Sequence, residues 1–421
     1  MKRIFIFLLQ GIQLKYLKHI NLSECESITE LPEFYTPSLE KLDLCCCQNL
    51  AKVHDSLGFL DKLQIWNLHG CRKLQILPKS LKLISLKYLN LGGCESITEL
   101  PEFCTPSLED LNLYYCQNLV KVHDSLGFLD KLQIWNLHGC RKLQILPKSL
   151  KLISLKSLYL VKCESITELP EFCTPSLERM DLSFCKNLVK VHESVGILDK
   201  LRIWYLFRCE KLQILPDILR LKSLWEFNLT DCFRLEKFPN IHPEMKSLLA
   251  LNLSGSAIRE LPSSIKYLTG LYGLDLMDCK NLRYLPDDIY KLQLLKELSI
   301  PTAKLRQTND YLDGFSKCGF LNLKSLDFRG NKNIIELDFL MKPEFFPVLN
   351  FLDLSETNIV SIPKSLSRFA NLEVLEIRNC KQLREIPRLP QSVRDVDVRN
   401  CYSLNAQSSS RLLNQVSLFF Y

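Results

Sequence analysis

The residues best able to do chemistry in this sequence are its 18 cysteines and seven histidines, which could act as nucleophiles, metal ligands or disulfide partners. Five of the cysteines, Cys45, Cys46, Cys104, Cys173 and Cys318, follow no pattern. The other thirteen end a recurring motif, L-x-x-L-x-L-x-x-C, and they are Cys25, Cys47, Cys71, Cys94, Cys116, Cys140, Cys163, Cys185, Cys209, Cys232, Cys279, Cys380 and Cys401. No base or charged partner recurs beside these thiols. We therefore interpret them as small buried side chains that fill space and donate a weak S–H hydrogen bond after a strand.

Metal binding and catalysis are not predicted. No C-x-x-C pair has a second pair at zinc-finger spacing, and we expect the run Cys45–Cys47 to alternate between the two faces of a strand end. His54, His123 and His192 are one position in three copies of a repeat, which favours a structural role. The sequence also lacks the common phosphate-loop, dinucleotide, serine-hydrolase and zinc-protease motifs. We expect no cofactor, no metal site and no enzyme activity.

Composition narrows the partners and the compartment. The net charge is only +7 over 421 residues, without the basic clustering of a nucleic-acid-binding protein. No run of eighteen apolar residues occurs, so we expect no membrane span. Unpaired thiols in repeat after repeat favour a reducing compartment, the cytoplasm or the nucleus, over secretion.

The elements that position these cysteines come from an internal repeat. Cys25, Cys94, Cys163 and Cys232 are each 69 residues apart, and residues 52–85 are identical to 121–154. Each 69-residue block divides into three shorter units. Starting from Leu17, we count 17 units at steps of 21 to 28 residues.

This spacing predicts a solenoid. The two leucines of L-x-L face the same side of a strand, and the earlier leucine also points inward. Leu-Pro pairs such as Leu31-Pro32 and Leu77-Pro78 mark the return of the chain, because proline cannot donate to a strand ladder. We expect an α/β fold: a curved leucine-rich-repeat horseshoe, with a parallel sheet on the concave side and short 3₁₀ or extended segments on the convex side.

Several phrases resemble one protein family in particular. They are L-K-H-I-N-L-S-E-C at 17–25, K-V-H-D-S-L-G-F-L-D-K-L at 52–63, G-C-R-K-L-Q-I-L-P-K-S-L at 70–81 and L-N-L-S-G-S-A-I-R-E-L-P-S-S-I at 251–265. They are similar to the repeat region of plant disease resistance proteins of the Toll/interleukin-receptor-type, nucleotide-binding class. The resemblance covers about 14–401 and implies three parts: an apolar leader or truncated first repeat at 1–13, the repeat array at 14–401, and a tail at 402–421 that resembles the approach to a post-repeat domain.

The resemblance also implies a function. Members of the family carry signalling and nucleotide-binding domains that this sequence does not match, so it resembles the sensor module alone. We expect non-catalytic recognition of a protein in plant innate immunity: a pathogen effector, a guarded host protein or a nucleotide-binding receptor domain. An intracellular leucine-rich-repeat signalling scaffold without an immune role is the alternative.

The internal copies indicate where a partner would bind. Residues 25–85 and 94–154 differ at six positions, and four of these (41/110, 43/112, 45/114 and 46/115) are x positions of the motif, which we expect on the concave side. Recognition and simple drift both explain this pattern. From the fifth to the tenth unit the x positions carry residue types that dominate protein interfaces, which we predict to form a partner-binding patch: Tyr114, Tyr115, Tyr159, Phe184, Tyr205, Phe207, Arg208 and Trp225.

Two further expectations accompany this patch. Its rings could instead pack on one another or on a further domain of a parent receptor. Residues 302–320 depart from the repeat, and we expect them to form a long loop.

Overall fold

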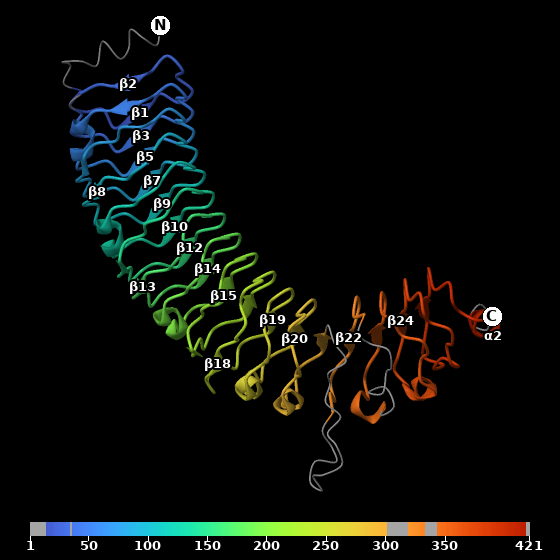
Figure 1. Ribbon diagram of the computed structural model, residues 1–421. Coiled ribbons are helices and arrows are strands. Elements are labelled where there is room, and N and C mark those ends of the chain that lie inside the picture. Colours follow the sequence, from blue (N-terminus) through green and yellow to red (C-terminus); the bar gives the residue numbers. More distant parts are fainter. Residues whose placement is uncertain (1–13, 34–35, 301–318, 333–342, 418–421) are drawn as a thin grey trace. The chain divides into compact units, whose positions relative to one another are not determined.

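The computed structural model describes residues 14–33, 36–300, 319–332 and 343–417 (Figure 1). The proposed leader at 1–13 and almost all of the proposed loop at 302–320, with Cys318, lie outside the described residues. The chain divides into two units, Met1–Leu224 and Trp225–Tyr421, each of which is described by itself.

The first unit is a stack of parallel strands of three residues each. Neighbouring strands pair in strict register; for example, Leu89 pairs with Leu111 and Trp135 with Leu158. The strands are β1 (His19–Asn21), β3 (Lys41–Asp43), β5 (Ile65–Asn67), β7 (Tyr88–Asn90), β9 (Asp110–Asn112), β10 (Ile134–Asn136), β12 (Ser157–Tyr159), β14 (Arg179–Asp181) and β15 (Ile203–Tyr205).

The return path of this unit uses 3₁₀ turns and two-residue strands. The turns are η1 (Asp55–Phe59), η2 (Asp124–Phe128) and η3 (Glu193–Ile197), and His54, His123 and His192 cap them by accepting a backbone N–H on the side chain. The short strands are β2 (Glu30–Leu31) with β4 (Lys52–Val53), β6 (Ser80–Leu81) with β8 (Glu102–Phe103), β11 (Ser149–Leu150) with β13 (Glu171–Phe172), and β16 (Ile218–Leu219).

The second unit repeats this plan. Its strands are β17 (Glu226–Asn228), β19 (Ala250–Asn252), β20 (Gly273–Asp275), β21 (Glu297–Ser299), β22 (Ser325–Asp327), β23 (Phe351–Asp353), β24 (Val374–Glu376) and β25 (Asp395–Asp397), with the short β18 (Asn240–Ile241). Its 3₁₀ turns are η4 (Ser263–Tyr267), η5 (Asp287–Lys291), η7 (Pro343–Phe345) and η8 (Lys364–Arg368). In Figure 1 these coiled turns lie on the side away from the strands.

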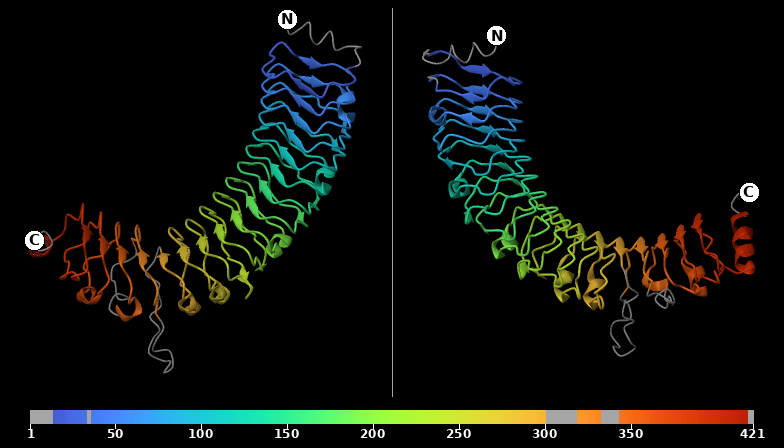
Figure 2. Two further views of the ribbon diagram at one scale, coloured as in Figure 1. Left: turned by 180° about the vertical axis from the view of Figure 1, so that it is seen from behind. Right: turned by 45° about the horizontal axis from the view of Figure 1, so that its top comes forward.

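A helix, α2 (Ala406–Ser417), follows the last repeat. Figure 2 shows it at the end of the second unit. Arg411 Nη1 donates to the Ile386 carbonyl at 2.9 Å, and Leu412 is buried. The helix therefore supplies hydrogen bonds to the return segment of the repeat before the last, whose groups would otherwise meet solvent.

The predicted solenoid with a parallel sheet and 3₁₀ turns is confirmed. The leucines of each motif are buried, and Trp66, Trp135 and Trp204 take a leucine position without exposure. Because each rung covers its apolar edge only with its neighbours, the core is a continuous column in each unit.

The patterned cysteines are part of this column. Twelve of the thirteen are buried, and Cys401 is half-buried. The thiol donates to the carbonyl of the previous rung, from Cys71 to Leu44 at 3.2 Å and from Cys185 to Leu160 at 3.1 Å. Burial raises the pKa of the Cys71 and Cys185 thiols to about 12, so they stay protonated at neutral pH. The structural role predicted for them is confirmed.

Candidate functional site

Each strand ends in a tight turn that has one unusual backbone position. The turn contains two residues between the last leucine and the motif cysteine, and the second of them has a positive φ. Glycine fills this position at 70, 93, 139, 255 and 330, which suits its conformational freedom. Tyr115 (φ 59°), Phe184 (φ 63°) and Arg208 (φ 56°) hold the same left-handed conformation with large side chains. Their N–H groups bond the next rung, as Tyr115 N–H does to the His138 carbonyl at 2.7 Å.

The last residue of the strand normally caps this turn. An Asn or Asp there accepts a hydrogen bond from the backbone N–H two residues on, as Asn136 does from His138 at 3.0 Å. The structure shows this bond in thirteen repeats. Tyr159 and Tyr205 occupy the same position in β12 and β15, and tyrosine cannot form this cap. These two repeats lack a local bond that thirteen others show.

The first aromatic group lies on the turns after β9 and β10. The Tyr114 and Tyr115 ring centroids are 4.4 Å apart, and the His138 ring stacks on Tyr115 at 5.5 Å. Gly139 makes room for this stack, because a Cβ there would lie 2.9 Å from the Tyr115 ring. Desolvation, reinforced by Lys162, lowers the pKa of His138, so its ring is neutral at pH 7.

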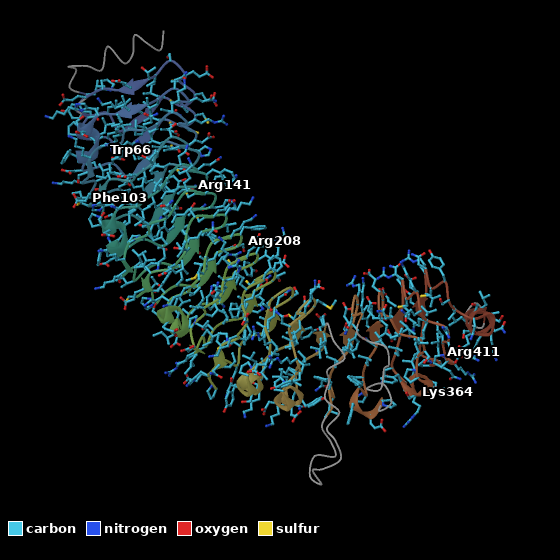
Figure 3. The ribbon with its side chains drawn as sticks, viewed as in Figure 1. Trp66, Phe103, Arg141, Arg208, Lys364 and Arg411 are labelled. Carbon is cyan, nitrogen blue, oxygen red and sulfur yellow. The ribbon has the colours of Figure 1, made fainter. Side chains whose placement is uncertain are left out.

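The second aromatic group lies on the turns after β12, β14 and β15. The Phe184 and Phe207 rings meet edge to face at 5.0 Å. The Arg208 guanidinium carbon is 5.4 Å from the Phe207 ring centroid, and the Lys162 ammonium is 5.9 Å from that of Phe184. Figure 3 shows Arg208 and Arg141 along the same edge of the stack. The group presents cations attached to aromatic faces, an arrangement typical of protein-binding surfaces.

The third group lies on the strands themselves. Arg179 begins β14, and the strands on either side end in Tyr159 and Tyr205. The guanidinium carbon of Arg179 lies 5.9 Å from the Tyr159 ring centroid and 5.4 Å from that of Tyr205. Sequence reasoning missed Arg179. Aligning the repeats in register would have placed it between the two tyrosines.

Seven of the eight predicted patch residues therefore fall into these groups. Tyr114 is 40 % exposed, Arg208 is exposed, and the other five are half-buried. The rings contact one another, which is one of the two alternatives to partner binding that the sequence left open. Trp225 is 53 % exposed and begins the second unit, so it belongs to none of these groups.

The expectation that Cys45 and Cys46 alternate between the two faces of a strand end was wrong. They lie in a turn, where their sulfurs approach to 3.4 Å, and not on alternating faces of a strand. Cys47 points inward and donates to the Leu22 carbonyl at 3.0 Å. Among the described residues, no group of three or more His, Cys, Asp or Glu is placed to hold a metal ion, and no helix is long and apolar enough to cross a bilayer.

Comparison with known proteins agrees with this geometry. Residues 220–412 match a family described as leucine-rich repeats of RPS4B-like disease resistance proteins. These residues are similar to the leucine-rich repeats of plant disease resistance proteins. The array is 31 % identical to disease resistance protein RPS6 of Arabidopsis thaliana over 292 residues, 62 % of the chain and 25 % of that protein. It is 30 % identical to the TMV resistance protein N of Nicotiana glutinosa over 291 residues, 58 % of the chain and 25 % of that protein.

The leucine-rich-repeat array thus spans about a quarter of the length of these relatives. Among solved structures it is similar to the leucine-rich-repeat protein LIC12759 of Leptospira interrogans, with 20 % identity, a TM-score of 0.48 and coverage of 98 % of this chain and 96 % of that one.

Proposed function

We propose that this chain is a non-catalytic protein-recognition module of plant innate immunity, and that the strand and turn surface of residues 108–209 binds the partner. The relatives above are resistance proteins, which supports the immune setting. The partner is a pathogen effector, a guarded host protein or a nucleotide-binding receptor domain, in the cytoplasm or nucleus.

The observation that carries the proposal is that this surface holds residues the fold disfavours. A bulky residue in the left-handed region costs of order 1 kcal/mol, and Tyr115, Phe184 and Arg208 each sit there. Tyr159 and Tyr205 also leave their turns without the usual cap. Glycine or asparagine would suit the left-handed backbone at positions 115, 184 and 208. Asparagine or aspartate would cap the turns at positions 159 and 205. Eight other non-glycine residues of the described array share the left-handed conformation, but none of them is aromatic, so the bulky side chains and not the backbone conformation mark this surface.

The internal duplication supports the same surface. The pairs 41/110 and 43/112 lie on strands β3 and β9, and the pairs 45/114 and 46/115 lie in the turns that follow. The buried leucines of the two copies are unchanged. One copy therefore carries a half-buried cysteine pair where the other carries the Tyr114–Tyr115 stack, and the core is the same in both.

Proximity labelling in leaf cells tests the proposal. The full chain, fused to a labelling enzyme, is compared with a variant carrying Tyr159→Ala, Phe184→Ala, Tyr205→Ala and Phe207→Ala. We expect the variant to lose the labelled effector or receptor proteins and to keep its circular dichroism spectrum. A folded variant with an unchanged set of labelled proteins contradicts the proposal.

The control replaces exposed aromatics on the return side. Phe59 and Phe128 are 53 % and 55 % exposed on η1 and η2. The variant Phe59→Ala with Phe128→Ala should keep the labelled set. A set free of effectors and immune receptors, but lost with the four-site variant, would favour a signalling scaffold.

A further inference from the structure

Arg179 lies against two aromatic rings, and its side chain has no acceptor among the described residues. Its side chain is half-buried, and its Nε is buried without a hydrogen-bond partner. Within the described part of the chain it makes no ion pair. Its contacts with the Tyr159 and Tyr205 rings stabilise the charge but supply no oxygen. A guanidinium has five N–H donors, and a buried donor left unpaired costs of order 1–3 kcal/mol.

The two nearby acids are already engaged. Asp181, on the same strand, accepts the Ser183 N–H at 3.0 Å as a turn cap. Glu178 pairs with Arg202 at 3.9 Å. Neither is an ion-pair partner of Arg179, so its positive charge stays open to an outside acceptor.

Positive charge is concentrated in three consecutive motifs. The motifs at 155–163, 177–185 and 201–209 contain five cations, Lys156, Lys162, Arg179, Arg202 and Arg208, against the two acids. The motif at 132–140 contains no charged residue, and the motif at 108–116 contains two acids and no Lys or Arg. A cationic, aromatic surface favours a partner that is itself acidic and partly apolar.

We propose that Arg179, held between Tyr159 and Tyr205, binds the carboxylate of an Asp or Glu in an acidic segment of the protein partner. The two rings keep the guanidinium in place before binding, which reduces the entropy lost on association. The Phe184–Phe207 pair beside it contacts the apolar residues of the same segment. This inference rests on the proposed function and adds the chemistry of the partner.

Peptide selection with the full chain tests it. A phage-displayed library of random dodecapeptides is selected against the wild-type chain. The best binder is then resynthesised with each acid replaced by its amide. Binding is measured by fluorescence polarisation to the wild-type chain and to Arg179→Gln, Lys156→Gln and Tyr159→Ala/Tyr205→Ala variants.

We expect selected peptides rich in Asp or Glu next to apolar residues. Arg179→Gln should weaken the best binder about tenfold or more, the amide peptide should lose as much against the wild-type chain, and the two changes together should add little. Lys156→Gln, which removes an exposed charge of a neighbouring rung without releasing an acid, should change affinity by less than about threefold.

The outcomes separate the two proposals. If the tyrosine variant abolishes binding but the amide peptide binds as well as the acid, the carboxylate site is wrong and the proposed function stands. Equal losses with Lys156→Gln and Arg179→Gln also overturn the site, because they indicate general charge attraction. If no selected peptide depends on Tyr159 and Tyr205, or none is selected, both proposals fail.

Discussion

The strand and turn surfaces of residues 155–209 and 323–401 stabilise their positive charges in different ways. In 155–209 arginines and a lysine lie against aromatic rings. In 323–401 the arginines of the turns lie against carboxylates at the strand ends. Arg329 reaches Asp327 at 3.4 Å and Asp353 at 3.7 Å, and Arg399 reaches Asp397 at 2.6 Å.

The difference shows which groups neutralise or stabilise the positive charges of each surface. An acid at the strand end both caps its turn and faces the arginine two residues on, as Asp327 does for Arg329. The turn arginines Arg329, Arg378 and Arg399 therefore have their counter-charges within the chain. Residues 155–209 replace two of the caps with tyrosine and leave Arg179 without an acid. A partner that supplies an acid therefore stabilises the surface of residues 155–209 more than that of residues 323–401.

The largest expected contrast comes from two glycines at the same turn position. Gly139→Ala should cost about 2–3 kcal/mol, since a Cβ there both occupies a left-handed position (φ 78°) and meets the Tyr115 ring at 2.9 Å. Gly330→Ala has a similar φ of 75° and nothing within 4 Å, so it should cost only about 1 kcal/mol. Guanidinium chloride unfolding measures both.

A double variant identifies the cause of this contrast. With Tyr115→Ala present, Gly139→Ala should cost no more than Gly330→Ala, because the colliding ring is gone. Equal costs for the two glycines in the wild-type background would show that the aromatic stack is not packed as described.

The arginines give the next contrast. Arg329→Gln should destabilise the chain by about 1–2 kcal/mol, because Asp353 is buried and loses its counter-charge. The value stays low because about half of Arg329 is exposed and solvent screens the pair. Arg179→Gln should cost less than about 1 kcal/mol, because only ring contacts are lost.

Peptide binding should rank these two variants in the opposite order. Arg329→Gln should leave the selected acidic peptides bound, whereas Arg179→Gln should release them. Urea or guanidinium unfolding supplies the stability order and polarisation supplies the binding order. If the same arginine variant caused both the larger loss of stability and the larger loss of peptide binding, the two surfaces would not differ in the way described.

The missing caps give a smaller effect. Asn136→Tyr should cost about 1 kcal/mol, since the His138 N–H loses its acceptor at 3.0 Å. Tyr159→Asn should stabilise the chain by about 0.5 kcal/mol, the new cap being partly offset by the lost contact with Arg179. The same Tyr159→Asn variant should bind acidic peptides more weakly. Thermal unfolding and polarisation check the two expectations, and a stabilised variant with full binding would contradict the role given to Tyr159.

The sequence predicted the parts of the fold that depend on spacing. The L-x-L step places Leu89 and Leu91 on one side, and the motif cysteines follow them inward as predicted. The partner-binding residues remain a prediction. Their rings were identified by type, but which rings touch depends on the register of neighbouring rungs.

Two features of the site were readable from the sequence and were missed. Glycine recurs at 70, 93 and 139 in the turn, which signals a positive φ for Tyr115, Phe184 and every other residue at that position. Alignment of the strand ends would likewise have shown Arg179 flanked by tyrosines. The buried Nε of Arg179 was not readable, because it depends on how the two rings lie over the guanidinium.

The smallest effect concerns an acid of the second unit that has a cap role but no arginine after it. Asp275 accepts the Met277 N–H at 2.9 Å, and burial, opposed in part by that hydrogen bond, raises the pKa of its carboxyl above the ordinary value. The folded state thus favours the protonated form. At neutral pH the carboxylate destabilises the fold, and this penalty disappears as the pH falls through the folded pKa and below the unfolded one.

Asp275→Asn should keep the cap and remove the buried charge. We expect it to stabilise the chain by about 0.5 kcal/mol or less at pH 7, with the advantage shrinking toward pH 4. The converse change, Asn252→Asp at the same position of the preceding repeat, should destabilise it at pH 7. Denaturant unfolding across this pH range measures both. A gain in stability that did not depend on pH would mean that the carboxylate of Asp275 is as well solvated as an exposed one. The strand-end acids of the second unit would then need no arginine as a counter-charge.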